Sequence, residues 1–471
     1  MAFFTGGVHP SYNKLTANKE IKAAKIPKKV ILPLSQHTGA VCEPLVNVGD
    51  EVKIGQKIAE SKAYVSAPIH ASISGRVIDI SEQLSPLGNK VKSITIISGR
   101  KIEWHGLVKP RENTEALTKE QIIDMSEIAT RNLPASARSK MAISEHAQEH
   151  APHLSAGSVL DIIKEAGIVG LGGAMFPTHV KLNVKDKKID TVILNGAECE
   201  PYLTCDHRLM LEQPDKIING LKLIMKAVGA EKAYIGIEDN KKDAVELLTK
   251  KLKNEKNIEV KELKTIYPHG AEKMLICSIT QRKVPPRKLP LDVGVVVSNV
   301  QTAKAVYDAV YEGKPLIERI VTVTGDVKNP QDMLVKIGTP FKDLIEECGG
   351  YAKEPFKLIA GGPLMGIAQP NADVPVIKGT SGILALSKIE IEKEKPCIKC
   401  AACVDACPVI LMPNIIAEYS KHERYDDADK VFALDCFECG CCSFVCPSKI
   451  PLVERIKKAK AEIIKKLKEK G

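Results

Sequence analysis

Short apolar runs that alternate with polar residues, with Gly and Pro between them, fill residues 30–100. The pattern is clearest in two stretches, VILPLSQHTGAVCEPLVNVGDEVKIGQKIAES and YVSAPIHASISGRVIDIS. A period of two residues predicts β-strands with one buried face, and turns at this spacing favour a small barrel or sandwich. We therefore expect a β-rich unit over residues 30–100.

Helical and strand patterns alternate over residues 155–316. Apolar residues recur three and four positions apart in SVLDIIKEAGIV, PDKIINGLKLIMKAVG, KKDAVELLTKKLKN and QTAKAVYDAVYEG, and short buried runs separate them, DTVILNG, KAYIGIED and VGVVVSNV. This alternation predicts a layered α/β domain. Over residues 317–388, RIVTVTGDVKNPQ, one helix (FKDLIEECGG) and FKLIAGGPLMG indicate a small α+β unit.

The remaining segments are polar or basic. Residues 1–29 are expected to form a basic N-terminal arm, and residues 101–154 a polar connector. Residues 451–471 have the pattern of a final helix, and from Ser448 onward the chain holds nine Lys or Arg against three Glu. Such a helix could lie on anionic lipid or on an acidic partner, or it could pack on the protein with a solvated lysine face.

The composition is that of a soluble globular protein. The 471 residues suffice for roughly three or four domains, and 44% are hydrophobic against 27% charged. No apolar run reaches the ~18 residues that span a bilayer, and no secretory signal pattern opens the sequence. We expect a cytosolic protein, or one docked from the cytosolic side. With 4% aromatic residues and no nucleic-acid-binding motif, the net charge of +10 does not indicate DNA or RNA as a partner.

Nine of the fourteen cysteines lie in two runs of identical spacing near the C-terminus. Each run reads Cys-x2-Cys-x2-Cys-x3-Cys-Pro, the pattern of ferredoxins with two [4Fe-4S] clusters, in which the fourth cysteine of each run binds the other cluster. The spacing assigns one cluster to Cys397, Cys400, Cys403 and Cys446. It assigns the second to Cys436, Cys439, Cys442 and Cys407. Zinc knuckles have a different spacing, and the ninth cysteine, Cys441, is expected to be a neighbour rather than a ligand.

A pair of clusters carries single electrons and needs a site that exchanges them with a substrate. The candidate is the glycine-rich loop in GIVGLGGAMFPTHVKL, with Gly170, Gly172, Gly173 and, further on, Lys181. Glycines let a backbone approach a phosphate, and amides with a lysine neutralise it. The loop lacks a full G-x-G-x-x-G and follows a helix, so a loop that merely ends a helix stays an alternative.

Three further segments place polar residues in loops where α/β sheets bind ligands. The segments are NGAECEP, YPHGAEK and SNVQT. Their candidate residues are Asn195, Glu198 and Glu200 in the first, Tyr267, Gly270 and Glu272 in the second, and Asn299 and Thr302 in the third.

The four segments occur in the order found in the flavin-binding subunit of respiratory complex I. The β-rich unit is similar to biotinyl or lipoyl carriers in VNVGDEVKIGQKIAES and APIHASISGRV, and FTGGVHP precedes it. With the paired cysteine runs, the whole chain resembles the RnfC family of the Rnf electron-transport complex. The resemblance implies a multidomain α/β plus β protein. Its parts would be a barrel-sandwich hybrid over residues 30–100, a complex-I-like α/β domain over 155–316, an SLBB-type β-grasp over 317–388 and a two-cluster ferredoxin domain over 389–450.

The resemblance also implies FMN and a nicotinamide nucleotide as ligands. The residues it assigns to FMN are Gly170, Gly172, Gly173, Lys181, Asn195, Ala197, Glu198, Asn299 and Thr302. It places Phe176 against the nucleotide, with Glu200 and Glu272 near its polar groups and Tyr267 and Gly270 in the same region. Leu171 and Met175 replace the Arg and Gly of the complex I loop, which makes the phosphate side less basic, and Lys273 replaces a Thr.

Flavin can exchange two electrons with nicotinamide and single electrons with a cluster. We therefore expect a peripheral oxidoreductase subunit of the Rnf membrane complex, on the cytoplasmic face of the membrane. It would exchange electrons between NAD(H) and a ferredoxin-linked chain, coupled in the assembly to ion translocation. Two alternatives stay open: a soluble flavo-iron–sulfur reductase, such as a cobalamin reductase, and a non-catalytic iron–sulfur relay scaffold.

Isolated residues carry weaker signals. Lys62 lies where a carrier would bear its modified lysine, but its flanks, SKA, lack the expected methionines, so we interpret it as a surface lysine. Cys199, Cys205 and His207 fit no regular zinc spacing.

Overall fold

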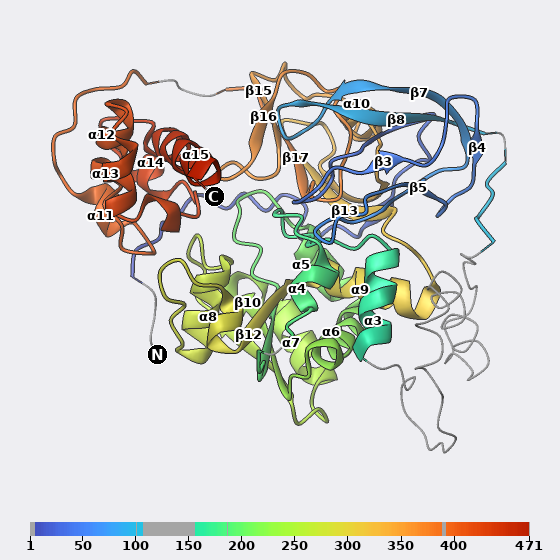
Figure 1. Ribbon diagram of the computed structural model, residues 1–471, viewed down its shortest axis with the longest axis horizontal. Helices are drawn as coiled ribbons and strands as arrows, with labels where there is room; N and C mark the ends of the chain where they lie inside the picture. The colour runs from blue at the N-terminus through green and yellow to red at the C-terminus, as the bar shows by residue number, and fades with distance from the viewer. Residues whose placement is uncertain (1–4, 100, 107–155, 186, 389–391, 471) are drawn as a thin grey trace.

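The computed structural model describes residues 5–99, 101–106, 156–185, 187–388 and 392–470. Four units pack together (Figure 1), with two β-rich units above an α/β domain and a helical, cysteine-rich unit at one side. The connector predicted over residues 101–154 lies outside the described part of the chain from residue 107 onward. Among the helices that are described, none has the length and apolar character needed to cross a membrane.

The first β-rich unit is a sandwich of two small sheets, as the period-two pattern predicts. One sheet has the strand order β2-β8-β7-β4 and the other β3-β5-β6. The strands are β2 Lys29–Pro33, β3 Glu43–Pro44, β4 Glu51–Val52, β5 Lys57–Glu60, β6 Ile69–His70, β7 Gly75–Leu84 and β8 Lys90–Ser98. Alternate residues such as Val30, Leu32, Ile94 and Ile96 are buried in the core, so one face of each strand supplies the packing.

The α/β domain is built on a parallel sheet of order β11-β10-β9-β12. Its strands are β9 Thr191–Asn195, β10 Lys232–Glu238, β11 Ile258–Leu263 and β12 Val295–Asn299. The α-helices are α3 Ala156–Glu165, α4 Thr178–Leu182, α5 Cys205–Glu212, α6 Pro214–Val228, α7 Lys242–Lys251, α8 Glu272–Thr280 and α9 Val300–Glu312. Two short 3-10 turns, η1 Asp239–Lys241 and η2 Pro290–Val293, complete the domain.

Helices cover both faces of this sheet. Ile193 packs in a cluster with α8, whereas its neighbours Val192 and Val296 belong to the core shared with α6 and α9. With both faces covered, a ligand reaches a parallel sheet at the carboxyl ends of its strands. Here β9 and β12 end at Asn195 and Asn299.

The β-grasp unit contains a six-stranded sheet of order β1-β14-β13-β17-β15-β16. Its strands are β1 Lys22–Ala23, β13 Glu318–Gly325, β14 Gln331–Lys336, β15 Lys357–Ala360, β16 Ile367–Gln369 and β17 Gly382–Leu386, and α10 spans Phe341–Glu347. The helix packs on the sheet through Phe341 and Leu344. Strand β1 comes from the N-terminal segment and pairs in parallel with β14.

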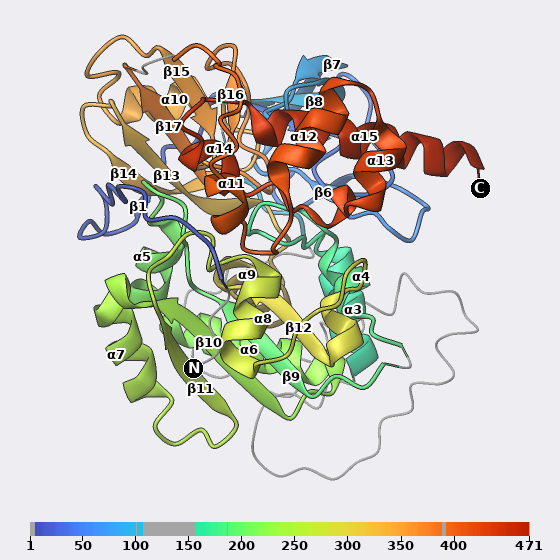
Figure 2. The ribbon, with the colours of Figure 1, turned by 90° about the vertical axis from the view of Figure 1, so that its left-hand side faces the viewer.

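The cysteine-rich unit is helical. Its elements are α11 Ala402–Asp405, α12 Pro413–Lys421, α13 Tyr425–Lys430, η3 Ala433–Asp435, α14 Cys441–Val445 and α15 Leu452–Lys470. The first turns of α15 bury Leu452, Ile456 and Ile463. Its last turns project from the body (Figure 2), where Ile464 and Leu467 are 42% and 54% exposed. The basic helix is therefore packed at its start and open to contacts at its end.

Residues 5–25 form an extended strap, here called the N-terminal strap, that crosses the other units (blue in Figure 1). Gly7 N donates to Ala406 O of the cysteine-rich unit at 3.0 Å, and Val8 exchanges two backbone hydrogen bonds with Tyr267 of the α/β domain. A Cβ on Gly7 would lie 2.8 Å from Tyr267 O, and its φ is +88°, so the crossing requires glycine.

Lys14 fixes the N-terminal strap to the loop that follows β9. Its Nζ donates to the carbonyl oxygens of Glu198 and Glu200 at 2.8 Å and of Leu203 at 2.6 Å. Burial lowers the pKa of Lys14, but three carbonyls take the place of its hydration water. The loop is thus held by a side chain more than 180 residues away in the sequence.

Replacing Lys14 by Met should leave these three carbonyls without their donor and lower the free energy of unfolding by about 2–3 kcal/mol. The matched control is Lys19→Met, since exposed Lys19 donates only to Pro330 O, and it should cost less than about 0.5 kcal/mol. Urea unfolding followed by circular dichroism measures both. Equal losses in the two variants would show that Lys14 does not hold the strap.

Candidate functional site

The carboxyl ends of β9 and β12 bring two asparagines side by side, because Asn195 and Asn299 are register partners in the parallel pair. Asn299 caps α9, where its Oδ1 accepts from the amides of Gln301 at 2.9 Å and Thr302 at 3.4 Å. Asn195 Nδ2 donates to Gly270 O at 2.8 Å. This edge of the sheet therefore presents two fixed amide side chains beside a helix N-terminus.

The glycine-rich loop, residues 169–177, is anchored over this edge through one residue. Leu171 N donates to Thr302 Oγ1 at 2.9 Å. Leu171 O accepts from Arg319 Nη2 at 3.4 Å, and the same guanidinium donates to Lys378 O at 2.6 Å. The leucine that replaces the arginine of the complex I loop is thus held through its backbone.

The glycines of the loop face outward. Gly170 N donates to Phe176 O at 2.9 Å and closes the loop. Gly172 and Gly173 are exposed, and a Cβ on Gly172 would lie 3.5 Å from Asn299 Cβ. No described atom lies within 4 Å of a Cβ built on Gly173, whose φ of +110° favours glycine. The loop offers an open edge of backbone next to the two asparagines.

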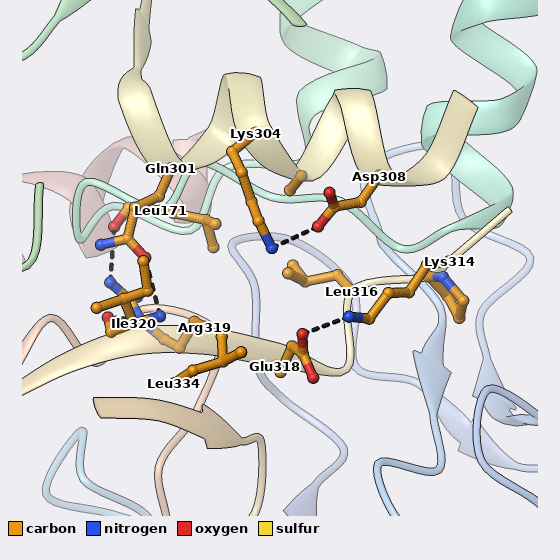
Figure 3. A pocket seen from close by; sticks show the side chains of 12 residues that line it. Leu171, Gln301, Lys304, Asp308, Lys314, Leu316, Glu318, Arg319, Ile320 and Leu334 are labelled. Carbon is orange, nitrogen blue, oxygen red and sulfur yellow. Dashed lines mark hydrogen bonds and ion pairs between the residues drawn. The ribbon is translucent and has the colours of Figure 1, made fainter. Parts of the chain in front are cut away.

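A small polar cavity lies beneath the loop (Figure 3). Lys304 pairs with Asp308 at 2.5 Å along α9, and Lys314 pairs with Glu318 on β13. Burial would raise the pKa of Glu318, but Lys336, Lys314 and Lys304 outweigh burial and hold that pKa well below its usual range. Because its charges are matched in pairs, the cavity supports the loop from below and joins α9 to β13.

Asp206, at the start of α5, links the loops around the site. Its carboxylate accepts from Asn299 Nδ2 at 2.7 Å and from Gln301 Nε2 at 2.9 Å. Burial and the nearby charge of Glu198 raise the pKa of Asp206 to about 6. Glu198 in turn accepts from the amides of Asp206 and the next residue. Glu198 and Asp206 lie close to the thiol of Cys205, but both carboxylates bond within the protein, so they act as a frame for the loop.

The loop after β9 packs against the segment that precedes α8. Ala197 N donates to Asn195 Oδ1 at 3.1 Å, and Ala197 O accepts from buried Lys241 Nζ at 2.6 Å. A Cβ on Gly270 would lie 3.1 Å from Cys199 Sγ, so this glycine permits the close contact. Cys199 therefore lies behind the loop and away from Cys205.

Lys181 and Glu272 form an ion pair beside the glycine-rich loop. Lys181 comes from α4, Glu272 opens α8, and their side chains are 29% and 44% exposed. A pair this exposed contributes little to stability. Phe176 is partly exposed in the same loop. These three residues are available to a ligand.

Two residues expected near a nucleotide lie elsewhere. The Glu200 carboxylate accepts from the amides of Met365 at 2.7 Å and Leu364 at 3.1 Å, in the β-grasp unit. Tyr267 is fully buried, and its hydroxyl donates to Cys439 O at 2.7 Å. Each side chain joins the α/β domain to another unit, because its partner is supplied by a distant segment that the local motif does not contain.

The eight cysteines of the two runs fall into two spatial groups. One pocket is lined by Cys397, Cys400, Cys403 and Cys446. Burial raises the pKa of Cys403, and the neighbouring thiols of Cys446 and Cys397 raise it further. Cys397 and Cys400 are exposed, so this first group lies at the surface.

The second group lies deeper in the molecule. It consists of Cys407, Cys436, Cys439 and Cys442, of which all but Cys436 are buried. Burial raises the pKa of Cys442, and the thiols of Cys436, Cys439 and Cys407 raise it further. Cys441 is fully buried beside this group and donates to Tyr267 O at 3.8 Å.

Several residues that hold the site were not found by sequence analysis. They are Lys14, Lys241, Asp206, Gln301 and Arg319. The lysines and the arginine lie in polar surroundings that indicate surface positions. Only Gln301 carried a usable signal, since it lies between Asn299 and Thr302 in SNVQT.

Three relatives are similar to this chain over most of their length. The RnfC protein of the Na(+)-translocating ferredoxin:NAD(+) oxidoreductase complex of Acetobacterium woodii is 46% identical over 98% of this chain and 97% of that protein. The corresponding protein of the proton-translocating ferredoxin:NAD(+) oxidoreductase complex of Clostridium ljungdahlii is 47% identical over 92% and 87%. That of the ion-translocating oxidoreductase complex of Rhodobacter capsulatus is 40% identical over 97% and 82%.

The chain belongs to the RnfC family of the ion-translocating oxidoreductase complexes. Three parts of it also match domain families: the RnfC Barrel sandwich hybrid domain over residues 2–101, the Nuo51 FMN-binding domain over 163–308 and the SLBB domain over 320–368. The family and the fold class expected from the sequence are therefore confirmed.

The Glu200 contact predicts a pH dependence. Burial outweighs the two amide donors and raises the pKa of Glu200 to about 7, from 4.5 in an unfolded chain. The folded state therefore keeps a proton that the unfolded state loses, and stability should fall as pH rises from about 4.5 to 7, by about 2–3 kcal/mol, then level off. Glu200→Gln should lack this fall.

Urea unfolding of both proteins between pH 5 and 8 measures the difference. The glutamine loses one acceptor at every pH, so only the change of the difference with pH is informative. Parallel pH profiles for the two proteins would contradict the assignment.

Proposed function

We propose that this protein exchanges electrons between NAD(H) and the one-electron carriers of an Rnf membrane complex, with bound FMN and two [4Fe-4S] clusters. One observation carries the proposal. The sheet edge with the glycine-rich loop and the second cysteine group belong to units that meet at Tyr267, whose hydroxyl donates to Cys439 O at 2.7 Å. When bound, FMN supplies the conversion between hydride and single-electron transfer, and the clusters supply the one-electron relay.

The residues at the sheet edge fit a flavin phosphate. Gly173 leaves open space beside backbone amides, and α9 directs its N-terminus to the same edge, capped by Asn299. Lys181 lies beside the loop and offers a positive charge. The residues that we assign to FMN are Gly170, Gly172, Gly173, Lys181, Asn195, Ala197, Glu198, Asn299 and Thr302.

The two cysteine groups fit two clusters. Each group offers four thiol ligands, the number that a [4Fe-4S] cluster takes, and each draws three from one run and one from the other. The amides of Leu411 and Glu438 point at Cys407 Sγ (3.3 Å) and Cys436 Sγ (3.4 Å). Amides directed at ligand sulfurs favour the reduced state of a cluster.

We place the nicotinamide nucleotide over the glycine-rich loop. Phe176 offers an aromatic face, and Gly270 and Glu272 border the loop from the α8 side. Glu272 would release Lys181 when an anionic ligand approaches. Glu200 and Tyr267, which the sequence placed with this group, act instead at the contacts between units.

The relatives are named as parts of ion-translocating complexes, with ferredoxin and NAD(+) in two of the names. We infer a peripheral position on the cytoplasmic face of the membrane, bound to the other Rnf subunits, with ferredoxin reached through them. One relative is named for Na(+) and another for protons, so we do not assign the ion to this chain. A soluble reductase would keep the same site but would not bind membrane subunits.

Gly173→Val should weaken FMN binding by about a hundredfold or more, because the side chain occupies the open edge that a phosphate would approach. Gly350→Val is the matched control, since Gly350 also has positive φ (+81°) and no described atom within 4 Å of its Cβ position. Quenching of FMN fluorescence measures the affinity. Absence of FMN binding by the unaltered protein would favour the relay-scaffold alternative.

Cysteine variants test the two groups separately. Cys446→Ala should remove the first cluster and Cys407→Ala the second, so each should lower the bound iron by about half. Cys441→Ala should change neither, although it is equally buried. Iron analysis with electron paramagnetic resonance of the reduced protein measures the outcome. Loss of iron in Cys441→Ala with retention in Cys446→Ala would overturn the ligand assignment.

A further inference from the structure

The two cysteine runs are repeats in structure as well as in sequence. Lys399 and Glu438 occupy the same position between ligand cysteines, and both have positive φ, +57° and +65°. Ala401 and Gly440 also correspond, with φ of +60° and +86°. The short helices α11 and α14 start directly after them. Each loop therefore presents a comparable face on the outer side of its cysteine group.

The face of the second loop is covered by other parts of the same chain. Phe437 packs in a cluster with Cys199, Tyr267 and Leu364, which belong to the α/β domain and the β-grasp unit. Gly440 lies against Leu364, with its Cβ position 3.2 Å from the carbonyl oxygen. This loop is the one through which the cysteine-rich unit contacts the flavin-site domain.

The face of the first loop has no such cover in the described part of the chain. Ile398, which corresponds to Phe437, is 67% exposed, and Lys399 is exposed beside it. Cys397 and Cys400 of the same loop are exposed as well. An apolar side chain with this exposure, next to a metal-binding loop, indicates a contact surface.

The charges around the first loop are selectively paired. Glu392 pairs with Lys449 at 2.9 Å, and Glu394 pairs with Arg455 at 2.6 Å. Within the described residues, Lys395 and Lys399 form no ion pair, so the unpaired charges at this rim are positive. Such a rim attracts an acidic surface.

We infer that the face of the first loop, formed by Ile398 with Lys395 and Lys399 at its rim, docks an acidic protein that carries a one-electron redox centre. The inference rests on the proposed function for the nature of that partner. The repeat supports it, because one of two equivalent faces already serves as a contact within the chain. The second group would then exchange electrons with the flavin site, and the first with the partner.

The test uses the cluster-loaded full chain and an acidic two-cluster ferredoxin as the probe. Lys395→Glu with Lys399→Glu should weaken binding about tenfold or more at low salt, and unaltered binding should fall steeply with ionic strength. The matched control is Lys253→Glu with Lys256→Glu, an equal charge change on exposed lysines between α7 and β11, at the opposite edge of the sheet. It should leave the affinity nearly unchanged. Isothermal titration calorimetry measures all three proteins.

Equal affinities in both double variants would overturn the inference. A second arm uses vesicles that contain phosphatidylglycerol. If the Lys395/Lys399 variant loses vesicle binding but keeps ferredoxin binding, the face binds lipid and the inference is wrong. Binding does not require electron flow, so the two proposals can fail separately. If NADH reduces no cluster in the unaltered protein, the proposed function fails, while the affinities still decide the docking face.

Discussion

The ammonium group of Lys14 is the contact on which the rest of the arrangement depends. The loop after β9 turns three carbonyls toward the N-terminal strap, and a buried carbonyl without a donor is costly. Lys241 plays the same part for Ala197 from the opposite side. The conformation of the candidate flavin loop is therefore set by two lysines, neither of which belongs to the motif that identified it.

The same strap explains why the units form one body. Gly7 contacts the cysteine-rich unit and Val8 contacts Tyr267, while β1 extends the β-grasp sheet. Glu200 adds a link between the α/β domain and the β-grasp unit. Because these contacts converge on the loop that borders the sheet edge, the geometry of the site and the docking of the cysteine-rich unit are coupled.

Local patterns were sufficient for the elements and insufficient for the contacts between them. Periodicity predicted α6, α9, β9 and β12, because their apolar spacing follows from packing on one sheet. It predicted neither β11, a polar edge strand, nor α5. The roles of Glu200 and Tyr267 depend on Leu364, Met365 and Cys439, which no local motif contains. Spacing grouped the cysteines, because a repeat carries its own partner.

Strand β1 has a consequence for how the protein is made. Its partner β14 is synthesised some 300 residues later, and Ala406, the partner of Gly7, later still. Until the ribosome has released most of the chain, the first residues have nowhere to bind, and the closing contacts are of very high sequence separation. Cofactors can thus be inserted into a nascent protein whose final clasp is still open, and the clasp can close only over a nearly complete polypeptide.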